Sequence, residues 1–378
     1  MQVTLVVTHL LGTGHLARAL TLGRAFAAAG DTVTVISGGR SVPHFDTTGI
    51  TLVQLPPLHS DGTDFSNLLT DGNVTADAPY LEARKDALLA HIRATPPDVL
   101  ITELFPFGRR GLKREFQALL DTAQALQTPP LILSSVRDIL APPSKAEKVT
   151  FANDLVSDAY DGVLVHSDEN VVALQESWPV SAALQDKLHY TGFVAPSAPT
   201  EVADTAGDII VSAGGGAVGD TLFSAALASA RRAPARSWHL LVGGNAARRS
   251  ALSQAAPANV TIEGPRPDFR ELLMGADISV SMCGYNTALD VLQTGVRAVL
   301  VPFDDGGEVE QTLRARALSK LPGIAVIRQA DLLGDALLRA IAKAEGGPDR
   351  PRQTAGMNGA ACTVDIVHDL HRRRAHEG

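Results

Sequence analysis

The sequence is poor in cysteine, in aromatic side chains and in long apolar runs. Its two cysteines, Cys283 and Cys362, match no zinc or redox spacing, so neither a disulfide-built fold nor a metal site is indicated. No apolar run approaches the roughly 18 residues of a membrane span, and no basic leader precedes the first apolar segment. These absences predict a cytoplasmic protein with free thiols.

An excess of basic residues is also missing. The formal net charge is -8; residues 1–195 carry 14 Lys and Arg against 21 Asp and Glu, and the remaining residues carry 19 against 20. Proteins whose main partner is nucleic acid concentrate positive charge on the binding domain. We therefore expect no nucleic-acid partner.

What the sequence does contain is an alternation of short β-branched runs with Ala- and Leu-rich stretches of helical period. This is the pattern of parallel strands joined by crossover helices. The first series predicts a helix at 15–30 and strands at 3–7, 31–37, 98–102, 130–135 and 162–166. Residues 193–207 are rich in Pro, Ala and small polar residues, which is typical of a linker.

A second series of strands follows the linker and again begins with a strand and a glycine turn, at 208–216. The prediction is an α/β protein with two doubly wound, Rossmann-like domains. We place the domains at 1–195 and 207–355, followed by a helix and tail at 356–378 that can pack back on the first domain.

Each predicted domain opens with glycines that bring the backbone close to a ligand at a helix N-terminus, where N–H groups favour an anion. The first turn, "HLLGTGH", holds Gly12 and Gly14, and the second, "VSAGGGAVGD", holds Gly214 and Gly215. Such turns also serve tight packing. His15 ends the first turn, where the helix N-terminus disfavours its protonated form and keeps it a base; capping or packing is the alternative role.

A third anion site is predicted within residues 274–318. Gly284 forms a turn after a strand, and the next helix begins with Tyr285, Asn286 and Thr287. Asp290, one turn further along, is placed to accept hydrogen bonds from a diol. Two more polar residues, which can bind hydroxyls, open another helix at Glu310 and Gln311.

The stretch "ADISVSMCGYNTALDVLQTGVRAVLVPF" with the later "EVEQTLRA" resembles the donor-binding half of glycosyltransferase family 28. The whole chain, including "HLLGTGH" and "TELFPFGRRGLKREF", is similar to bacterial proteins known only as predicted glycosyltransferases. The resemblance implies a GT-B fold, in which two Rossmann-like domains face across a cleft and the C-terminal one holds most of the nucleotide sugar.

The same resemblance implies roles for the C-terminal residues. Asp290 stands where the family usually has a glutamate that contacts the ribose. Glu310 and Gln311 stand where the family has a pair of glutamines that contacts the donor sugar. Arg266 falls near the base-binding segment. The diphosphate-binding loops correspond to Gly214, Gly215 and residues 284–287.

In the first domain, Glu103 ends a predicted strand, where open α/β sheets bind ligands, and is an alternative base. A basic cluster of Arg109, Arg110, Lys113 and Arg114 follows beside Phe105 and Phe107. It can contact an anionic acceptor or the inner face of the membrane. Equally, it can be a solvated helix start with phenylalanines in the core. Arg137 either lines the cleft or pairs with Asp138.

The sequence thus predicts a glycosyltransferase that inverts the anomeric carbon and moves a sugar from a UDP-linked donor to a small-molecule, lipid-linked or glycan acceptor. No DxD motif is found, so neither a metal nor a cofactor beyond the nucleotide sugar is expected, although Asp304 and Asp305 could hold a cation. Two alternatives remain open. One is a nucleotide-sugar hydrolase or 2-epimerase, because "GTGHLAR" resembles the "GxGHxxR" loop of such a hydrolase. The other is a non-catalytic nucleotide-sugar sensor.

Overall fold

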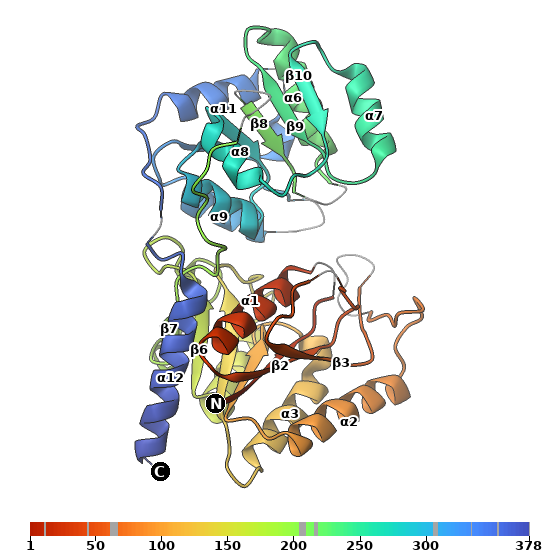
Figure 1. The fold of residues 1–378 in the computed structure, drawn as a ribbon, viewed down its shortest axis with the longest axis vertical. Helices are drawn as coiled ribbons and strands as arrows, with labels where there is room; N and C mark the ends of the chain where they lie inside the picture. Colours follow the sequence, from red (N-terminus) through yellow and green to blue (C-terminus); the bar gives the residue numbers. More distant parts are fainter. Residues whose placement is uncertain are drawn as a thin grey trace. The chain divides into compact units, whose positions relative to one another are not determined.

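The protein forms two compact units, shown in Figure 1. The N-terminal unit comprises Met1–Val194 and Asn358–Gly378, and the C-terminal unit comprises Ala195–Met357. The structure is a computed structural model, and it describes residues 1–10, 13–43, 45–60, 67–203, 209–214, 218–304, 309–333, 335–353 and 355–377. No helix within these ranges is both long enough and apolar enough to cross a membrane.

A parallel seven-stranded sheet forms the centre of the N-terminal unit, in the order β3-β2-β1-β4-β5-β6-β7. Its strands are β1 (Gln2–Val7), β2 (Thr32–Ser37), β3 (Ile50–Gln54), β4 (Val99–Glu103), β5 (Leu131–Arg137), β6 (Gly162–His166) and β7 (Leu188–Tyr190). Alternate side chains enter opposite cores: Val6 packs on one face, and Leu5 and Val7 pack on the other.

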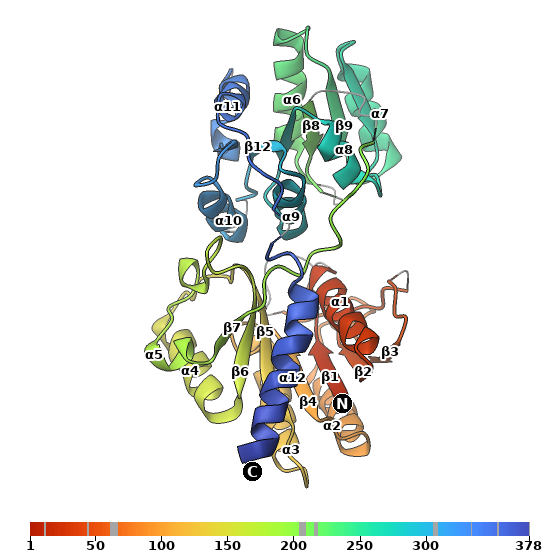
Figure 2. The ribbon, with the colours of Figure 1, turned by 60° about the vertical axis from the view of Figure 1, so that its left-hand side comes forward.

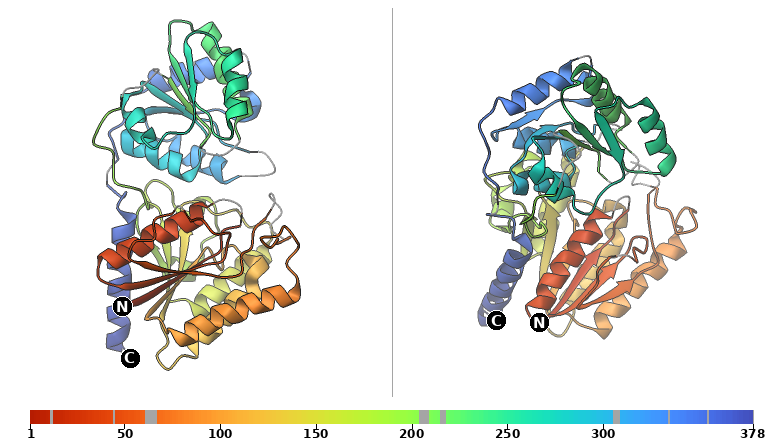
Figure 3. Two further views of the ribbon diagram at one scale, coloured as in Figure 1. Left: turned by 45° about the vertical axis from the view of Figure 1, so that its right-hand side comes forward. Right: turned by 45° about the horizontal axis from the view of Figure 1, so that its top comes forward.

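Helices cover both faces of this sheet, as Figure 3 shows. One core includes α2 (Ala78–Ala94), α3 (Lys113–Gln124) and α4 (Ala146–Ala159), with the short α5 (Ala182–Gln185) beside α4. The opposite core includes α1 (Gly14–Ala28) and α12 (Gly359–Glu377). The buried apolar residues of these helices repeat at helical spacing, so packing against the sheet selects their inner faces.

The last helix, α12, belongs to the N-terminal unit although the C-terminal unit precedes it in the sequence; it lies beside α1 in Figure 2. The His368 ring lies 2.7 Å from the Asp31 carboxylate, and Arg374 donates to Asp161 at 2.6 Å. The backbone N–H of Gly359 donates to the Phe193 carbonyl at 2.9 Å. A Cβ at Gly359 would lie 2.4 Å from a backbone oxygen, so this close approach requires glycine.

The C-terminal unit contains a parallel six-stranded sheet in the order β10-β9-β8-β11-β12-β13. The strands are β8 (Ile209–Ser212), β9 (Trp238–Leu241), β10 (Val260–Glu263), β11 (Ile278–Ser281), β12 (Arg297–Leu300) and β13 (Ile324–Val326). The helices are α6 (Asp220–Arg232), α7 (Ala246–Ala255), α8 (Phe269–Gly275), α9 (Tyr285–Thr294), α10 (Glu310–Leu318) and α11 (Ala336–Glu345). The prediction of two Rossmann-like doubly wound domains is therefore confirmed.

Candidate functional site

The candidate catalytic residues meet where the strand order of the N-terminal sheet reverses. β1 pairs with β2 on one side and with β4 on the other, and ligands of open α/β sheets bind at the carboxyl ends of strands at such a point. His15 lies in the first turn of α1, which follows β1, and Glu103 is the last residue of β4. Their contact, His15 Nδ1 to Glu103 Oε1, is 2.8 Å.

Arg18 completes this group from the next turn of α1. Its Nη2 donates to the same Glu103 Oε1 and lies 3.4 Å from His15 Nδ1. The side chains of Arg18 and Glu103 are 6% and 5% exposed, whereas the His15 side chain is 15% exposed. The sequence placed Arg18 in a motif but assigned it no role; its position three residues after His15, on the same helix face, was the available signal.

The protonation of the pair follows from its surroundings. Burial lowers the pKa of His15 to about 4 against the opposing effect of Glu103, and the charges of Arg109 and Arg137 lower it further. Burial by itself would raise the pKa of Glu103, but the positive charges around it hold that pKa well below its usual range. Because His15 is neutral at pH 7, Arg18 supplies the cation that keeps Glu103 ionised.

An ionised carboxylate can only accept hydrogen bonds, and this assigns the tautomer of His15. The Nδ1–H group donates to Glu103, so Nε2 carries the lone pair and is the basic nitrogen. The same arrangement orients the histidine of hydrolytic triads and stabilises the imidazolium that forms when the ring accepts a proton.

The start of α1 adds a site for negative charge beside His15. Thr13 is the N-cap residue and makes no side-chain capping bond, and α1 has no acidic residue in its first turn. Backbone N–H groups at such a helix end favour an anion. Space is open around Gly14, because nothing lies within 4 Å of a Cβ built there. Gly12 lies outside the described residues.

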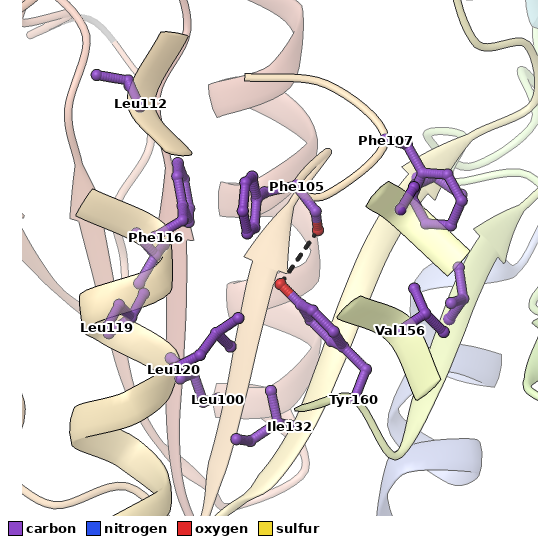
Figure 4. Packing of buried hydrophobic residues seen from close by; sticks show 14 of the residues in the cluster. Leu100, Phe105, Phe107, Leu112, Phe116, Leu119, Leu120, Ile132, Val156 and Tyr160 are labelled. Atoms are coloured by element: carbon purple, nitrogen blue, oxygen red, sulfur yellow. Dashed lines mark hydrogen bonds between the residues drawn. The ribbon is translucent and has the colours of Figure 1, made fainter. Parts of the chain in front are cut away.

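The core holds the segment that follows Glu103, as Figure 4 shows. The Phe105 ring stacks on Phe116 with 4.6 Å between centroids, and the Phe105 carbonyl accepts bonds from Ser134 and Tyr160. Phe107 is 2% exposed. Both phenylalanines are therefore core residues, as the second interpretation of this segment stated.

Of the predicted acceptor-side arginines, Arg109 and Arg137 lie close enough to His15 for their charges to lower its pKa. Arg109 has a φ of 56°, a left-handed conformation that is uncommon outside glycine, and it precedes the short helix at Arg110–Leu112. Arg110 instead donates to the Phe107 carbonyl at 2.7 Å. Arg109 and Arg137 are thus the predicted acceptor-side residues whose charges act on His15.

In the C-terminal unit, the two predicted diphosphate loops leave neighbouring strands. Ser212 of β8 is paired in register with Ser281 of β11, at another reversal of strand order. Gly214 has a φ of 80° and donates its N–H to the Ser212 hydroxyl at 3.2 Å. Gly284 is the N-cap residue of α9, and because it has no side chain it makes no capping bond to the first turn at Tyr285, Asn286 and Thr287. Gly215 lies outside the described residues.

The remaining predicted donor-binding residues make contacts within the protein. Burial raises the pKa of Asp290 to about 7, although Arg270, whose Nε lies 3.9 Å from Asp290 Oδ1, acts in the opposite direction. Gln311 Oε1 accepts the Phe303 N–H at 3.1 Å, next to Glu310 at the start of α10.

Arg266, predicted near the nucleotide base, pairs within its own loop. Its Nε donates to Asp268 at 2.8 Å and its Nη1 to Glu263 at 3.3 Å. In the described ranges no three His, Cys, Asp or Glu side chains form a group that could hold a metal ion. Of the predicted acidic pair, Asp304 accepts a bond from Gln329 at 3.1 Å, and Asp305 lies outside those ranges.

The C-terminal half of the chain is similar to known glycosyltransferases. Residues 214–370 match the glycosyltransferase family 28 C-terminal domain. Two curated relatives, from Desulforudis audaxviator and Agrobacterium fabrum, are both named UDP-N-acetylglucosamine--N-acetylmuramyl-(pentapeptide) pyrophosphoryl-undecaprenol N-acetylglucosamine transferase. They are 27% identical over 126 residues and 32% identical over 106 residues, which cover 32% and 27% of this chain. The matches span about a third of the relatives' own length, 34% and 28%.

Solved structures extend the similarity of fold to the whole chain. MurG of Acinetobacter baumannii is 17% identical with a TM-score of 0.59, covering 98% of this chain and 100% of that one. The glycosyltransferase VinC, in complex with dTDP, is 15% identical with a TM-score of 0.58, covering 100% and 98%. The chain therefore carries a glycosyltransferase family 28 C-terminal domain at residues 214–370 and has the GT-B fold, as its sequence resemblance predicted.

Proposed function

We propose that the protein transfers a sugar from a UDP-linked donor to an acceptor hydroxyl, with inversion at the anomeric carbon. The observation that carries the proposal is the buried contact between His15 and Glu103, which makes His15 Nε2 a neutral, oriented base. The family 28 domain supports a nucleotide-sugar donor, and both curated relatives are named for UDP-N-acetylglucosamine. The dTDP held by VinC makes a thymidine donor the competing choice.

In the proposed step, His15 Nε2 takes the proton of the acceptor hydroxyl as that oxygen bonds to the anomeric carbon. The bond from this carbon to the diphosphate oxygen breaks, and its electron pair leaves with the diphosphate. Glu103 stabilises the imidazolium, and Arg18 keeps Glu103 ionised, so both act as positioning residues.

The leaving diphosphate needs stabilisation, which the helix N-termini are suited to give. We assign this role to the first turn of α9 together with Gly214 in the C-terminal unit. Asp290, Glu310 and Gln311 are the proposed donor-sugar and ribose contacts. Because backbone N–H groups at helix N-termini can stabilise the charge of a diphosphate, we expect no metal requirement. Arg109 and Arg137 are proposed to face the acceptor, whether it is a small molecule, a glycan or a lipid-linked molecule at a membrane surface.

The test is a panel of UDP-, GDP- and dTDP-sugars, read by thermal shift and by release of nucleoside diphosphate with and without candidate acceptors, in the presence of EDTA. We expect one donor to bind selectively and to stay intact until an acceptor is added. The His15→Asn variant should keep donor binding and lose turnover by about 10²- to 10⁴-fold. His376→Asn, at an exposed histidine of α12, is the matched control.

Other outcomes would favour the alternatives. Rapid cleavage of the donor without an acceptor, lost in His15→Asn, would identify a hydrolase, and isomerisation of the intact donor would identify an epimerase. Selective binding with no turnover for any acceptor, and with the same response in His15→Asn, would identify a sensor.

A further inference from the structure

The carboxylate of Asp290 lies on α9 just beyond the proposed diphosphate site. Asp290 stands four residues after Asn286, which at a rise of about 1.5 Å per residue is roughly 6 Å further along the helix. Its side chain is 14% exposed. The residues that the structure describes donate no hydrogen bond to this carboxylate, because the paired Arg270 Nε lies 3.9 Å from Oδ1. An ionised carboxylate can accept about four hydrogen bonds, so Asp290 can accept those of a ligand.

Arg270 belongs to α8 and is fixed by contacts within the C-terminal unit. Its Nη1 donates to the Ser197 carbonyl and, at 3.5 Å, to Gln293 Oε1. Gln293 is 2% exposed and donates its Nε2 to the Pro196 carbonyl at 2.8 Å. Both contacts of Arg270 use Nη1, whereas Nε is the guanidinium nitrogen that faces Asp290. The protein thus holds this positive charge beside the carboxylate.

The charged groups that act on Asp290 come from α8. They are Arg270 and Glu271, which have opposite effects on the carboxyl group. Two further arginines lie at the ends of α9. Arg350, in the segment after α11, and Arg314 of α10 each donate to a backbone carbonyl within two residues of the helix. Arg270 is therefore the arginine whose charge is paired with Asp290.

This pairing decides the form in which Asp290 meets a ligand. Burial raises the pKa of Asp290 to about 7, and Arg270 acts in the opposite direction. Without Arg270, burial and Glu271 would both raise the pKa and leave a neutral carboxyl group at pH 7. Hydrogen bonds from hydroxyl groups to a carboxylate are roughly twice as strong as those between neutral groups. The positive charge of Arg270 therefore favours the form that binds hydroxyl groups more tightly.

We infer that Arg270 is a positioning residue of the donor site, which holds Asp290 as a carboxylate for the two hydroxyls of a ribose. The choice of a ribose rests on the proposed function, since the ribose of a nucleoside diphosphate is the group next to the diphosphate. The Arg270–Asp290 pair itself does not depend on that function. A 2′-deoxyribose offers one of the two hydroxyls, so this arrangement favours ribonucleotide donors over dTDP-linked ones.

The first experiment measures the titration of Asp290 in the full-length protein without ligand, by NMR of ¹³C-labelled aspartate carboxyl groups. Asp290→Asn assigns the signal. We expect a midpoint near pH 7 in the wild type and a midpoint higher by about one pH unit or more in Arg270→Gln. Arg270→Lys keeps the charge and should stay closer to the wild type. Arg339→Gln, at an exposed arginine of α11, is the control and should change nothing.

The second experiment measures the Kd of UDP and of 2′,3′-dideoxy-UDP by calorimetry between pH 6 and pH 8.5. Both molecules carry the same base and diphosphate, so the ratio of their Kd values isolates the two hydroxyls. We expect the wild type to prefer UDP by about tenfold or more above pH 7 and to lose this preference below it. In Arg270→Gln the loss should occur about one pH unit higher. If the donor panel selects GDP, GDP and its dideoxy analogue replace this pair.

An Asp290 midpoint that Arg270→Gln leaves unchanged would overturn the inference, whatever the protein binds. A Kd ratio that does not change with pH, or that changes at the same pH in Arg270→Gln as in the wild type, would overturn it as well. Arg270→Met, which also removes the charge, replaces Arg270→Gln if that variant does not fold.

The proposed function can fail separately. A protein that binds UDP and transfers no sugar can still show both effects of Arg270→Gln, and an active transferase can lack both. A protein that binds neither UDP nor GDP would contradict the proposed class of donor and, with it, the ribose as the ligand of Asp290.

Discussion

At the scale of single residues, the chemistry depends on how little water reaches His15. Its ring is 15% exposed, and burial lowers its pKa to about 4. In our proposal Glu103 is too weak a base for this role, because the surrounding positive charges hold its pKa below the usual range of a carboxyl group. The sequence left His15 and Glu103 open as candidates for the base. In our proposal the different surroundings of the two side chains favour His15.

This separation predicts a pH profile. Because His15 acts in its neutral form, the wild-type kcat, measured with saturating donor so that titration of Asp290 near pH 7 does not enter, should stay constant down to about pH 5 and fall as the pH decreases through about 4. Glu103→Gln should reduce kcat/KM by about 10²- to 10⁴-fold with little change in the KM for the donor, since an amide does not stabilise the imidazolium. Steady-state kinetics across pH would check both; a Glu103→Gln variant with the wild-type rate would contradict the assignment.

At the scale of elements, a buried ion pair ties two helices to three strand ends. Arg84 of α2 donates to Glu115 of α3 at 2.8 Å, and it also binds the loops that follow β1, β2 and β3. A buried guanidinium is costly to desolvate, so its contribution is to fix the positions of these loops rather than to add much net stability.

Removing one partner of the Arg84–Glu115 pair should therefore lower the free energy of unfolding by much more than removing both. We predict that Arg84→Met lowers the free energy of unfolding by about 3–5 kcal/mol, because Glu115 is left buried and unpaired. The double variant Arg84→Met/Glu115→Leu should recover part of that loss. Urea unfolding followed by circular dichroism would measure both. The control is Lys85→Met, which removes a neighbouring cation paired with the exposed Glu82 and should cost less than about 1 kcal/mol. A double variant no more stable than Arg84→Met would refute this account.

At the scale of the whole molecule, we expect the stabilities of the two units to respond to pH in opposite directions. In the N-terminal unit, burial lowers the pKa of His166 to about 3 and that of His15 to about 4, from 6.5. Their contribution to stability is present above about pH 6.5 and is lost as the pH falls through the folded values. In the C-terminal unit, burial raises the pKa of Asp290 from 3.8 to about 7, so its contribution is present below 3.8 and is lost as the pH rises through about 7.

Calorimetry from pH 7.5 to about pH 5 should therefore show one unfolding transition moving down and the other moving up as acid is added. His166→Gln should flatten the first response by up to about 1.4 kcal/mol per pH unit, and Asp290→Asn should flatten the second by a similar amount. A single transition that neither substitution affects would contradict the prediction.

Much of this organisation could be predicted from the sequence, and the exceptions have physical reasons. The buried strands are continuous apolar runs and were found. The strands that were missed are the edge strands β3, which is largely exposed, and β7 and β13, which have three residues each. His15 and Glu103 were each identified from their place after a strand. Their contact, across 88 residues, follows from β1 lying beside β4, which no local pattern encodes.

Arg84 and His9 illustrate a second limit. An arginine within a polar helix and a histidine after a strand carry no local sign of burial, yet Arg84 is fully buried and His9 is nearly so. Burial of a polar side chain depends on the tertiary arrangement around it.

The return of α12 to the N-terminal unit also has a consequence for the order of biosynthesis. The ribosome produces residues 195–357 before it produces α12, whose Val364 and Val367 complete the core on the α1 face of the first sheet. The part of that core that α12 covers therefore stays exposed while the whole second unit is translated, over more than a hundred codons. The N-terminal unit starts folding first and is completed last.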